Sequence, residues 1–241
     1  MAATSKKNEP DFREAHIERI LETTKRLLSE VGSQKMTIRS LAAASGVAPA
    51  TLYNRFGGKE ALISMAVIDH YERNVLHGFI QHDGSGSPIE NFIHGLKLLT
   101  RTCHDNRSFT STLVGLYFKL DNDRHMPESM YGALYKTWLL LIEQMRQQDS
   151  LKKWVSAEAI AAEMCERAFA VILKWARQEI ADKTLFDRLV FGTLSILLGA
   201  SRGSQAGDIE QTLEKVLAKP GFRSRSALRK AGSKNPKPTS Q

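Results

Sequence analysis

The 241-residue chain lacks the features that mark secreted, membrane-spanning and disulfide-rich proteins. It has two cysteines, Cys103 and Cys165, which are too few for a disulfide framework and do not have the spacing of a zinc site. Residues 1–10 have no apolar core, so they do not resemble a signal peptide. The longest apolar run, Leu189–Ala200, is too short to cross a bilayer. We therefore expect a cytoplasmic protein without membrane contact.

Motifs of enzymes and metalloproteins are missing as well. The sequence has no G-x-S-x-G, no H-E-x-x-H and no P-loop glycine pattern, and nothing orders its Ser, His and Asp residues into a catalytic arrangement. His70 and His77 lie seven residues apart near Asp69 and His82, but no Cys/His cluster has zinc spacing. We expect no catalysis, no metal and no cofactor.

The pattern also lacks strands, because no segment alternates apolar and polar residues with β-branched enrichment. Hydrophobic residues make up 42% of the chain and charged residues 25%, as is ordinary for a soluble globular protein. A chain of this length can hold one or two domains with a buried core. The sequence therefore predicts an all-α protein.

The net charge of +8 belongs almost entirely to the C-terminal tail. Residues 219–241 carry seven cations and no acid, which leaves +1 for residues 1–218. The cations are Lys219, Arg223, Arg225, Arg229, Lys230, Lys234 and Lys237. We expect this tail to be disordered. Weak, nonspecific contact of the tail with DNA is the alternative.

The stretch TIRSLAAASGVAPATLYNRFGGK, residues 37–59, organises the rest of the chain. Its apolar spacing predicts two short helices around a tight turn. Thr37 suits the N-cap of the first helix, Gly46 allows the chain to reverse, and Pro49 suits the first position of the second helix. Ala48 leaves that second helix without a side-chain cap. The pattern predicts a helix-turn-helix, which places a helix in the DNA major groove.

The segment GVAPATLYNRFGGKEAL resembles the DNA-binding signature of TetR-family transcriptional regulators. In that family a Gly-Val turn precedes a recognition helix with T-L-Y-x-x-F, and a Lys-Glu pair opens the next helix. The likeness runs from about Arg13 to about Tyr71. It implies a homodimer bound to a palindromic operator in double-stranded DNA. Ala48 departs from the family, which often has Ser or Thr there, so we expect no phosphate contact at that position.

We expect the DNA-contacting residues on and around the second helix of this unit. They are Thr37, Arg39, Pro49, Ala50, Thr51, Tyr53, Asn54, Arg55 and Lys59. Pro49 and Ala50 suit a thymine methyl group, and Asn54 suits either an adenine edge or a phosphate. The hydroxyls of Thr51 and Tyr53 suit phosphate contacts, as the matching residues do in the resembling family.

Three cations complete this expected surface. Arg39 is placed to reach the DNA backbone or a base. Lys59 begins the next helix, where the helix dipole already favours a phosphate. Arg55 is equally compatible with DNA contact and with a salt bridge on the domain surface.

Helical spacing predicts a helix over 12–31 that Gly32 ends, and one long connecting helix over 59–80. The turn-rich segment at 81–88 interrupts the chain. Further helices are expected at 89–104, 108–120, 128–148, 157–181, 184–202 and 208–218. The predicted organisation is a disordered N-terminus (1–10), a DNA-binding domain (11–58), a larger effector-binding and dimerisation domain (59–218) and the basic tail.

The predicted helices 157–181 and 184–202 are apolar on more than one side. A helix of this kind must bury a second face against another element. We expect a four-helix dimer interface, the same pair to which the resemblance points. Its residues would be Cys165, Phe169, Leu173, Ala176, Phe191, Gly192, Ser195 and Gly199. The alternative is that both are core helices of a monomer.

Polar and aromatic residues in the predicted helices between 89 and 148 are candidates to line an effector cavity. They are His94, Cys103, Phe109, Tyr117, Phe118, Tyr131, Tyr135 and Trp138. The shortage of charge at these positions favours a hydrophobic or aromatic effector. At helical spacing the same aromatic residues equally suit a core.

Together these patterns predict a two-domain, homodimeric transcriptional repressor of the TetR type. Effector binding in the larger domain would tilt helix 59–80 and displace the recognition helices. One alternative is an activator, or a regulator without a ligand, on the same fold. The other is a helical enzyme or adaptor with an incidental helix-turn-helix.

Overall fold

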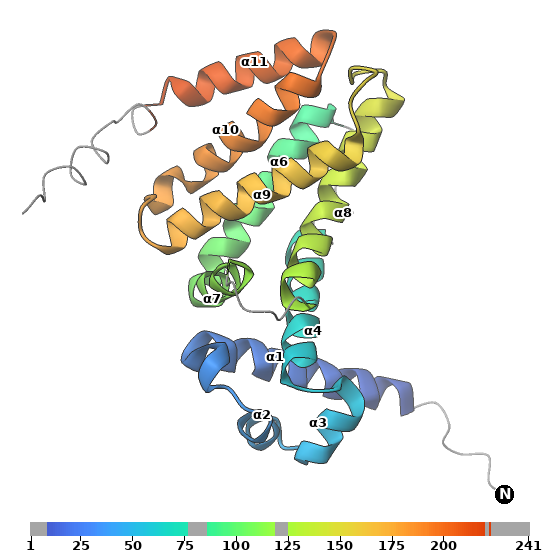
Figure 1. Cartoon of the computed structure of the whole chain (residues 1–241), viewed down its shortest axis with the longest axis vertical. Helices are drawn as coiled ribbons and strands as arrows, with labels where there is room; N and C mark the ends of the chain where they lie inside the picture. Colours follow the sequence, from blue (N-terminus) through green and yellow to red (C-terminus); the bar gives the residue numbers. More distant parts are fainter. Residues whose placement is uncertain (1–8, 77–85, 119–124, 220–221, 223–241) are drawn as a thin grey trace, which may run out of the picture.

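The computed structural model describes residues 9–76, 86–118, 125–219 and 222 (Figure 1). Its elements are α1 (Glu9–Lys35), α2 (Ile38–Ser45), α3 (Pro49–Phe56), α4 (Lys59–Tyr71), the π-helix η1 (Glu72–Leu76), α6 (Pro88–Asp105), α7 (Arg107–Tyr117), α8 (His125–Gln147), α9 (Ala157–Ala176), α10 (Asp182–Ala200) and α11 (Ser204–Leu217). Within these ranges no strand forms, and the one β-bridge joins Leu151 to Ser201. The all-α prediction is confirmed. Across the described residues, no helix is both long and apolar enough to cross a membrane.

The N-terminal helices α1, α2 and α3 form a small unit at one end of the molecule (Figure 1). Its core contains Ile20 and Leu28 from α1, Leu41 from α2 and Leu52 from α3, none of which has exposed surface. Burial of such a set stabilises the unit by about 1.5–3 kcal/mol per side chain before the cost of ordering the chain is counted. The short helices α2 and α3 are thus held by packing rather than by their own propensity.

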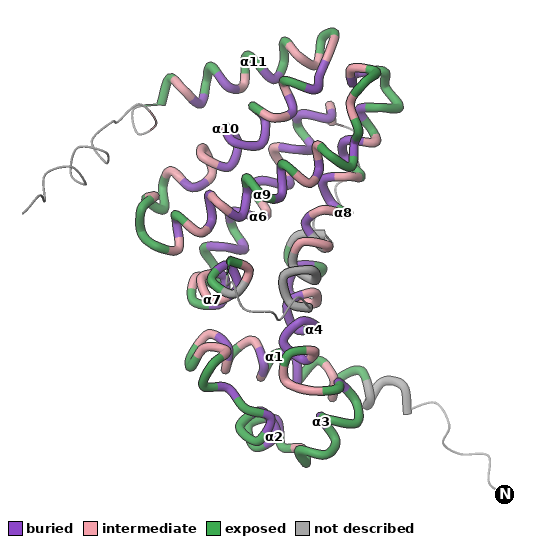
Figure 2. Tube along the Cα trace, viewed as in Figure 1, coloured by how far each residue is buried: buried purple, intermediate pink, exposed green. Residues whose placement is uncertain are grey.

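Helix α4 connects this unit to the larger helical domain. It packs against α1 and, more extensively, against α8 (Figure 1). Its residues Leu62, Ile63, Ala66 and Val67 are buried (Figure 2). Helix α4 therefore belongs to both cores and joins the N-terminal unit to the larger domain.

The larger domain is a bundle in which α8, α9 and α10 pack in succession and α11 covers α10. Helices α6 and α7 complete it (Figure 1). Phe92, Trp138, Phe169 and Trp175 are the largest side chains of its core, and none is more than 1% exposed.

The helix boundaries differ from the sequence prediction in several places. Helix α1 begins at Glu9, inside the predicted disordered N-terminus. Gly32 leaves the helical conformation with φ +73°, as expected, but a further helical turn follows it up to Lys35. Helix α9 ends at Ala176 rather than at 181, because Gln178 adopts a left-handed φ of +62°.

The connecting helix also differs from its prediction, because it is not α-helical throughout. Helix α4 passes into the π-helix η1 at Glu72. Residues 77–80 of the predicted helix lie outside the described residues, as does the basic tail apart from Lys219 and Phe222. A π-helical turn shifts the register of the side chains that follow it and often marks a functional position.

The contact between α1 and α4 is partly ionic. Lys25 Nζ lies 3.1 Å from Asp69 Oδ2, and the two side chains are only 12% and 16% exposed. Arg73 Nε donates to Asp69 Oδ1 at 2.7 Å and the same guanidinium contacts Glu18 of α1. Because the Lys25–Asp69 pair is shielded, salt weakens it less than an exposed pair.

His70 lies beside this ionic contact and is 4% exposed. Its ring packs edge-on against Phe109 of α7 with centroids 4.7 Å apart. Burial and, to a smaller extent, the charge of Lys25 lower the pKa of His70 from 6.5 to about 4, against the opposing effects of Glu22 and Asp69. The imidazole is therefore neutral at pH 7.

The low pKa of His70 predicts a stability loss in acid. The folded pKa lies below the unfolded value, so the unfolded chain takes up the proton first as the pH falls. The contribution of neutral His70 to the free energy of unfolding is complete above about pH 6.5 and is lost as the pH falls towards 4. Between pH 7 and pH 4 the wild-type protein should lose about 3 kcal/mol more unfolding free energy than His70→Gln. Urea unfolding across this range measures the difference, and parallel curves for the two proteins would contradict it.

Candidate nucleic-acid interface

Local hydrogen bonds begin α2 and form the turn between α2 and α3. Thr37 Oγ1 accepts a hydrogen bond from Ser40 N at 3.1 Å, while Ser40 Oγ accepts from Thr37 N at 3.0 Å. This reciprocal capping box begins α2. Gly46 adopts a left-handed φ of +69°, and Val47 N donates to Ala42 O at 3.0 Å, which ends α2 and reverses the chain. The predicted roles of Thr37 and Gly46 are confirmed, whereas the part of Ser40 was not foreseen.

Helix α3 turns one face inwards and the other outwards. Leu52 and Phe56 are buried, while Pro49 stands at the first position and Ala48 makes no side-chain cap, as predicted. The remaining residues expected to contact DNA on this helix are exposed, and so are Thr37, the N-cap of α2, and Arg39 on α2. Those on α3 are Pro49, Ala50, Thr51, Tyr53, Asn54 and Arg55. Figure 2 shows most of α3 as exposed. We call these eight residues the α3 face.

Charge favours an anionic partner at the α3 face. No acidic residue occurs between Glu30 and Glu60, whereas Lys35, Arg39 and Arg55 lie in that interval. Tyr53 is 57% exposed on this surface. Cations with interspersed hydroxyl groups are the groups that proteins use for phosphate contact.

Lys59 has a different environment from the one expected. Its ammonium donates to Ser33 O at 3.2 Å and lies 3.4 Å from Glu60 Oε1. The side chain is 26% exposed and ties the start of α4 to the turn that follows Gly32. A backbone carbonyl leaves no trace in a residue pattern, so this partner could not be read from the sequence. Its contact with phosphate stays a prediction.

Residues 20–65 match the family model for bacterial regulatory proteins of the tetR family. These residues form a TetR-family DNA-binding domain. The match covers α2 and α3 completely and the parts of α1 and α4 that pack against them. The comparison with curated proteins found no match.

Solved structures of TetR-family regulators share the fold of about three quarters of the chain. A TetR-family regulator of Syntrophomonas wolfei is 18% identical with a TM-score of 0.65, covering 77% of this chain and 96% of its own. FadR of Thermus thermophilus, a TetR-family repressor in complex with lauroyl-CoA, is 22% identical with a TM-score of 0.61, covering 78% and 96%. SmeT, the repressor of a Stenotrophomonas maltophilia multidrug efflux pump, is 13% identical with a TM-score of 0.59, covering 77% and 90%.

The residues expected to line an effector cavity do not form one group. Cys103 and Trp138 are core residues with 1% exposure, and burial raises the pKa of the Cys103 thiol to about 12. Phe109 belongs to the contact with α1 and α4, away from the other aromatic residues of the set, and His94 is half-buried on α6.

Four tyrosine and phenylalanine residues of the set lie at the α7–α8–α9 contact. Tyr117 stacks on Phe169 with centroids 4.5 Å apart and meets Phe118 edge-on at 5.0 Å. Tyr131 stacks on Tyr135 at 5.6 Å. Burial raises the pKa of Tyr131 to about 12, with smaller effects from Cys165 and other neighbours. We call Tyr117, Phe118, Tyr131 and Tyr135 the aromatic cluster.

Three residues expected in the dimer interface lie inside the chain's own packing. Cys165 and Phe169 have no exposed surface, because α7 and α8 cover that side of α9. At Gly192 the side chain of Arg167 occupies the space expected for a helix of the second chain, since an added Cβ would lie 2.6 Å from the Arg167 Nε. In this arrangement Cys165 and Phe169 therefore have no surface to offer a second chain, whereas the contact expected of Gly192 stays a prediction, because the exposed Arg167 side chain can move. The other five residues remain accessible: Leu173, Ala176 and Phe191 are half-buried, and Ser195 and Gly199 are exposed.

The missing cap of α3 predicts a stabilising substitution. Ala48 has φ −70° and ψ 142°, the extended conformation of an N-cap residue. In Ala48→Ser the new hydroxyl should accept from a free N–H of the first turn and raise the unfolding free energy by about 1 kcal/mol. Thr37→Ala, which removes an existing cap, should lower it by a similar amount. Urea unfolding of both variants tests the pair, and no gain for Ala48→Ser would show that the start of α3 needs no further acceptor.

Proposed function

We propose that the chain is a TetR-type repressor whose dimer binds a palindromic operator and is released by a small-molecule effector. The observation that carries the proposal is the acid-free, exposed α3 face, backed by Leu52 and Phe56. A short helix with a buried back and a polar front is the arrangement that enters the major groove. The match of residues 20–65 to the TetR family supports the same role.

Within this surface the chemistry of each residue suggests its contact. Pro49 and Ala50 are small and apolar, which suits a thymine methyl group, while the amide of Asn54 suits an adenine edge. Thr51 and Tyr53 have hydroxyl groups for phosphates, which fix the register of the helix on the duplex. Sequence preference would then come mainly from Asn54 and the apolar pair.

The dimer would form through the outer faces of α9 and α10. Leu173, Ala176, Phe191, Ser195 and Gly199 keep surface on these helices after the chain has folded. Two-fold symmetry requires the operator half-sites to repeat with the spacing of one or more DNA turns, about 34–36 Å each. The larger domain, taken as residues 59–218, would thus set the distance between two copies of residues 11–58.

Release by a hydrophobic or aromatic effector is supported by the aromatic cluster and by α4. The cluster lies where α8, which packs along α4, meets α7 and α9. Two of the similar structures are repressors, one of them solved with lauroyl-CoA. A ligand that separates α8 from α7 would move α4 and with it the α3 face. It can do so only by the difference between its affinities for the two arrangements.

Substitutions in the α3 face should affect DNA binding without affecting stability. Tyr53→Phe removes one exposed hydroxyl and should weaken operator binding about tenfold, equally for all sequences, if the hydroxyl contacts a phosphate. Asn54→Ala should cost about 1–3 kcal/mol and relax the preference at one base pair. Electrophoretic mobility shift with a palindrome from upstream of the protein's own gene measures both.

The matched control for these variants is Gln144→Ala, an exposed side chain on α8 far from the α3 face. It should leave the affinity unchanged. If Tyr53→Phe and Asn54→Ala also left the affinity unchanged, the α3 face would not be the reading surface.

Gly199→Arg should convert the dimer into a monomer. Gly199 is exposed on α10, and an added Cβ would meet nothing within 4 Å among the residues that the structure describes. The variant should therefore fold as well as the wild type but place two long cations in the interface. Gly207→Arg on α11 is the control, since Gly207 is equally exposed and unobstructed. Analytical ultracentrifugation should show a monomer for Gly199→Arg alone, and a dimer in both variants would place the interface elsewhere.

A further inference from the structure

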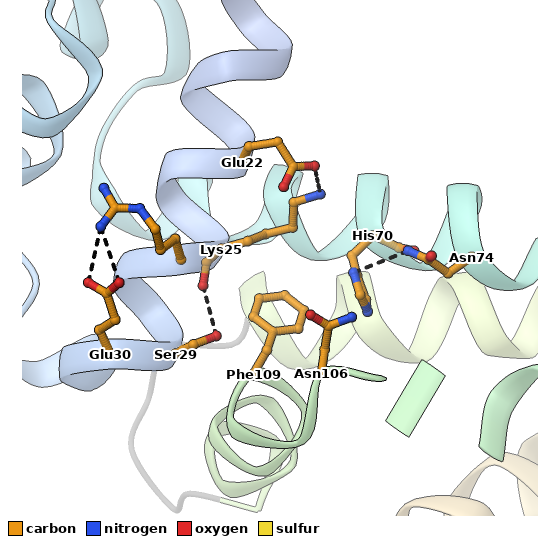
Figure 3. Close-up of a pocket in the computed structure, with 9 residues that line it drawn as sticks. Glu22, Lys25, Ser29, Glu30, His70, Asn74, Asn106 and Phe109 are labelled. Atoms are coloured by element: carbon orange, nitrogen blue, oxygen red, sulfur yellow. Dashed lines mark hydrogen bonds and ion pairs between the residues drawn. The ribbon is translucent and has the colours of Figure 1, made fainter. Parts of the chain in front are cut away.

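A cavity of about 490 Å³ lies where α1 meets α4, η1 and the α6–α7 turn. Its nine lining residues are Glu22, Lys25, Arg26, Ser29, Glu30, His70, Asn74, Asn106 and Phe109. Eight of them are polar or charged, unlike the aromatic cluster at the α7–α8–α9 contact. The volume is within the range of small-molecule sites. Figure 3 shows α1 on one side of the space and His70, Asn106 and Phe109 converging on it from the other elements.

His70 presents an unused hydrogen-bond donor in this cavity. Asn74 Nδ2 donates to His70 O at 2.7 Å, which fixes the amide orientation, because a carbonyl oxygen only accepts. The same Nδ2 lies 3.3 Å from His70 Nδ1, so that ring nitrogen accepts and the proton of the neutral ring is on Nε2. Nε2 is buried and has no hydrogen-bond partner in the described part of the chain. A buried N–H without a partner costs about 1–3 kcal/mol, which a ligand oxygen would recover.

The charges around the cavity are already paired within the protein. Lys25 contacts Glu22 and Asp69, and Arg26 Nη1 lies 3.2 Å from both carboxylate oxygens of Glu30. An anionic ligand would therefore meet no unpaired cation, and a cationic ligand would meet no unpaired acid. The free donor is a neutral N–H, which favours an uncharged acceptor.

We propose that this junction cavity binds a small, uncharged, planar molecule with a carbonyl-type oxygen. The oxygen accepts from His70 Nε2, and the planar part packs on the ring of Phe109, which stands edge-on to His70 at 4.7 Å between centroids. The amide of Asn106 at the rim offers a further donor and acceptor. The site is distinct from the aromatic cluster and from the α3 face.

The position of the cavity allows a bound ligand to affect the arrangement of α1 relative to α4 and α7. Ser108 Oγ donates to Ser29 O at 2.6 Å, so α7 holds α1 directly beside the space. Lys25 and Asp69 join α1 to α4 on its other side. A ligand in the cavity contacts all three helices and stabilises one arrangement of the N-terminal unit against the larger domain.

Benzamide is a suitable probe, since it is uncharged, planar and has a carbonyl oxygen. Toluene lacks the acceptor and benzoate adds a negative charge. The titration uses the full chain without DNA and follows His70 Nε2 and Hε1 by long-range ¹H–¹⁵N NMR. Benzamide should bind saturably and shift Nε2, and it should bind at least about tenfold more tightly than toluene or benzoate. Because the titration contains no DNA, its result does not depend on whether the protein is a repressor.

Two variants locate the binding. Asn106→Trp fills the rim of the cavity from an exposed position and should weaken benzamide binding at least about tenfold. Arg101→Trp places the same side chain on the exposed face of α6, away from the cavity, and should bind benzamide as the wild type does. The proposal is overturned if wild-type protein binds no benzamide, if benzoate binds more tightly, or if both variants bind equally. A wild-type Nε2 without a proton would overturn it independently of any variant.

Discussion

Every other relation in the molecule depends on the burial of α4 from two sides. Leu62 and Val67 have no exposed surface, because α1 covers one part of the helix and α8 another. Packed interiors respond to strain by moving whole elements rather than by bending. The orientation of the α3 face relative to the larger domain is therefore set by how α4 lies between α1 and α8 and by the direct contact of α7 with α1, since α3 itself has few contacts outside the N-terminal unit.

The polar character of this junction distinguishes it from the cores on either side. Lys25 and Asp69, which are 12% and 16% exposed, lie with the neutral His70 between α1 and α4, and the half-exposed Arg73 of η1 pairs with Asp69. Replacing such a network by apolar residues is often neutral or stabilising in proteins, so the network is a weak source of stability. Such a network tolerates movement, because ion pairs and hydrogen bonds can form again with other partners after a small rotation. Interlocked apolar side chains cannot rearrange in this way.

The sequence was sufficient wherever the signal was local. The cap at Thr37, the reversal at Gly46 and the buried positions of α3 each depend on residues within one turn, and all three were predicted. Residues that depend on neighbours far along the chain were not. The stripe with Cys165 and Phe169 was recognised as a face to be buried, but α7 covers it rather than a second chain. Likewise the junction cavity draws its lining from three segments far apart in the sequence, residues 22–30, 70–74 and 106–109, so no spacing rule could assemble it.

The energies available at the junction limit what an occupant of the cavity can do. A ligand that makes one hydrogen bond to His70 and one ring contact with Phe109 in only one of two arrangements binds that arrangement more tightly by about 1–3 kcal/mol. That changes an equilibrium about 5- to 150-fold, whereas a shift from 1:99 to 99:1 needs about 10⁴-fold. An occupant of the junction therefore tunes the balance between arrangements, and a complete switch requires a larger difference in buried contact, of the kind that only the core of the larger domain can offer. The two sites would then act on the same helix, α4, and their effects on its position would be coupled reciprocally.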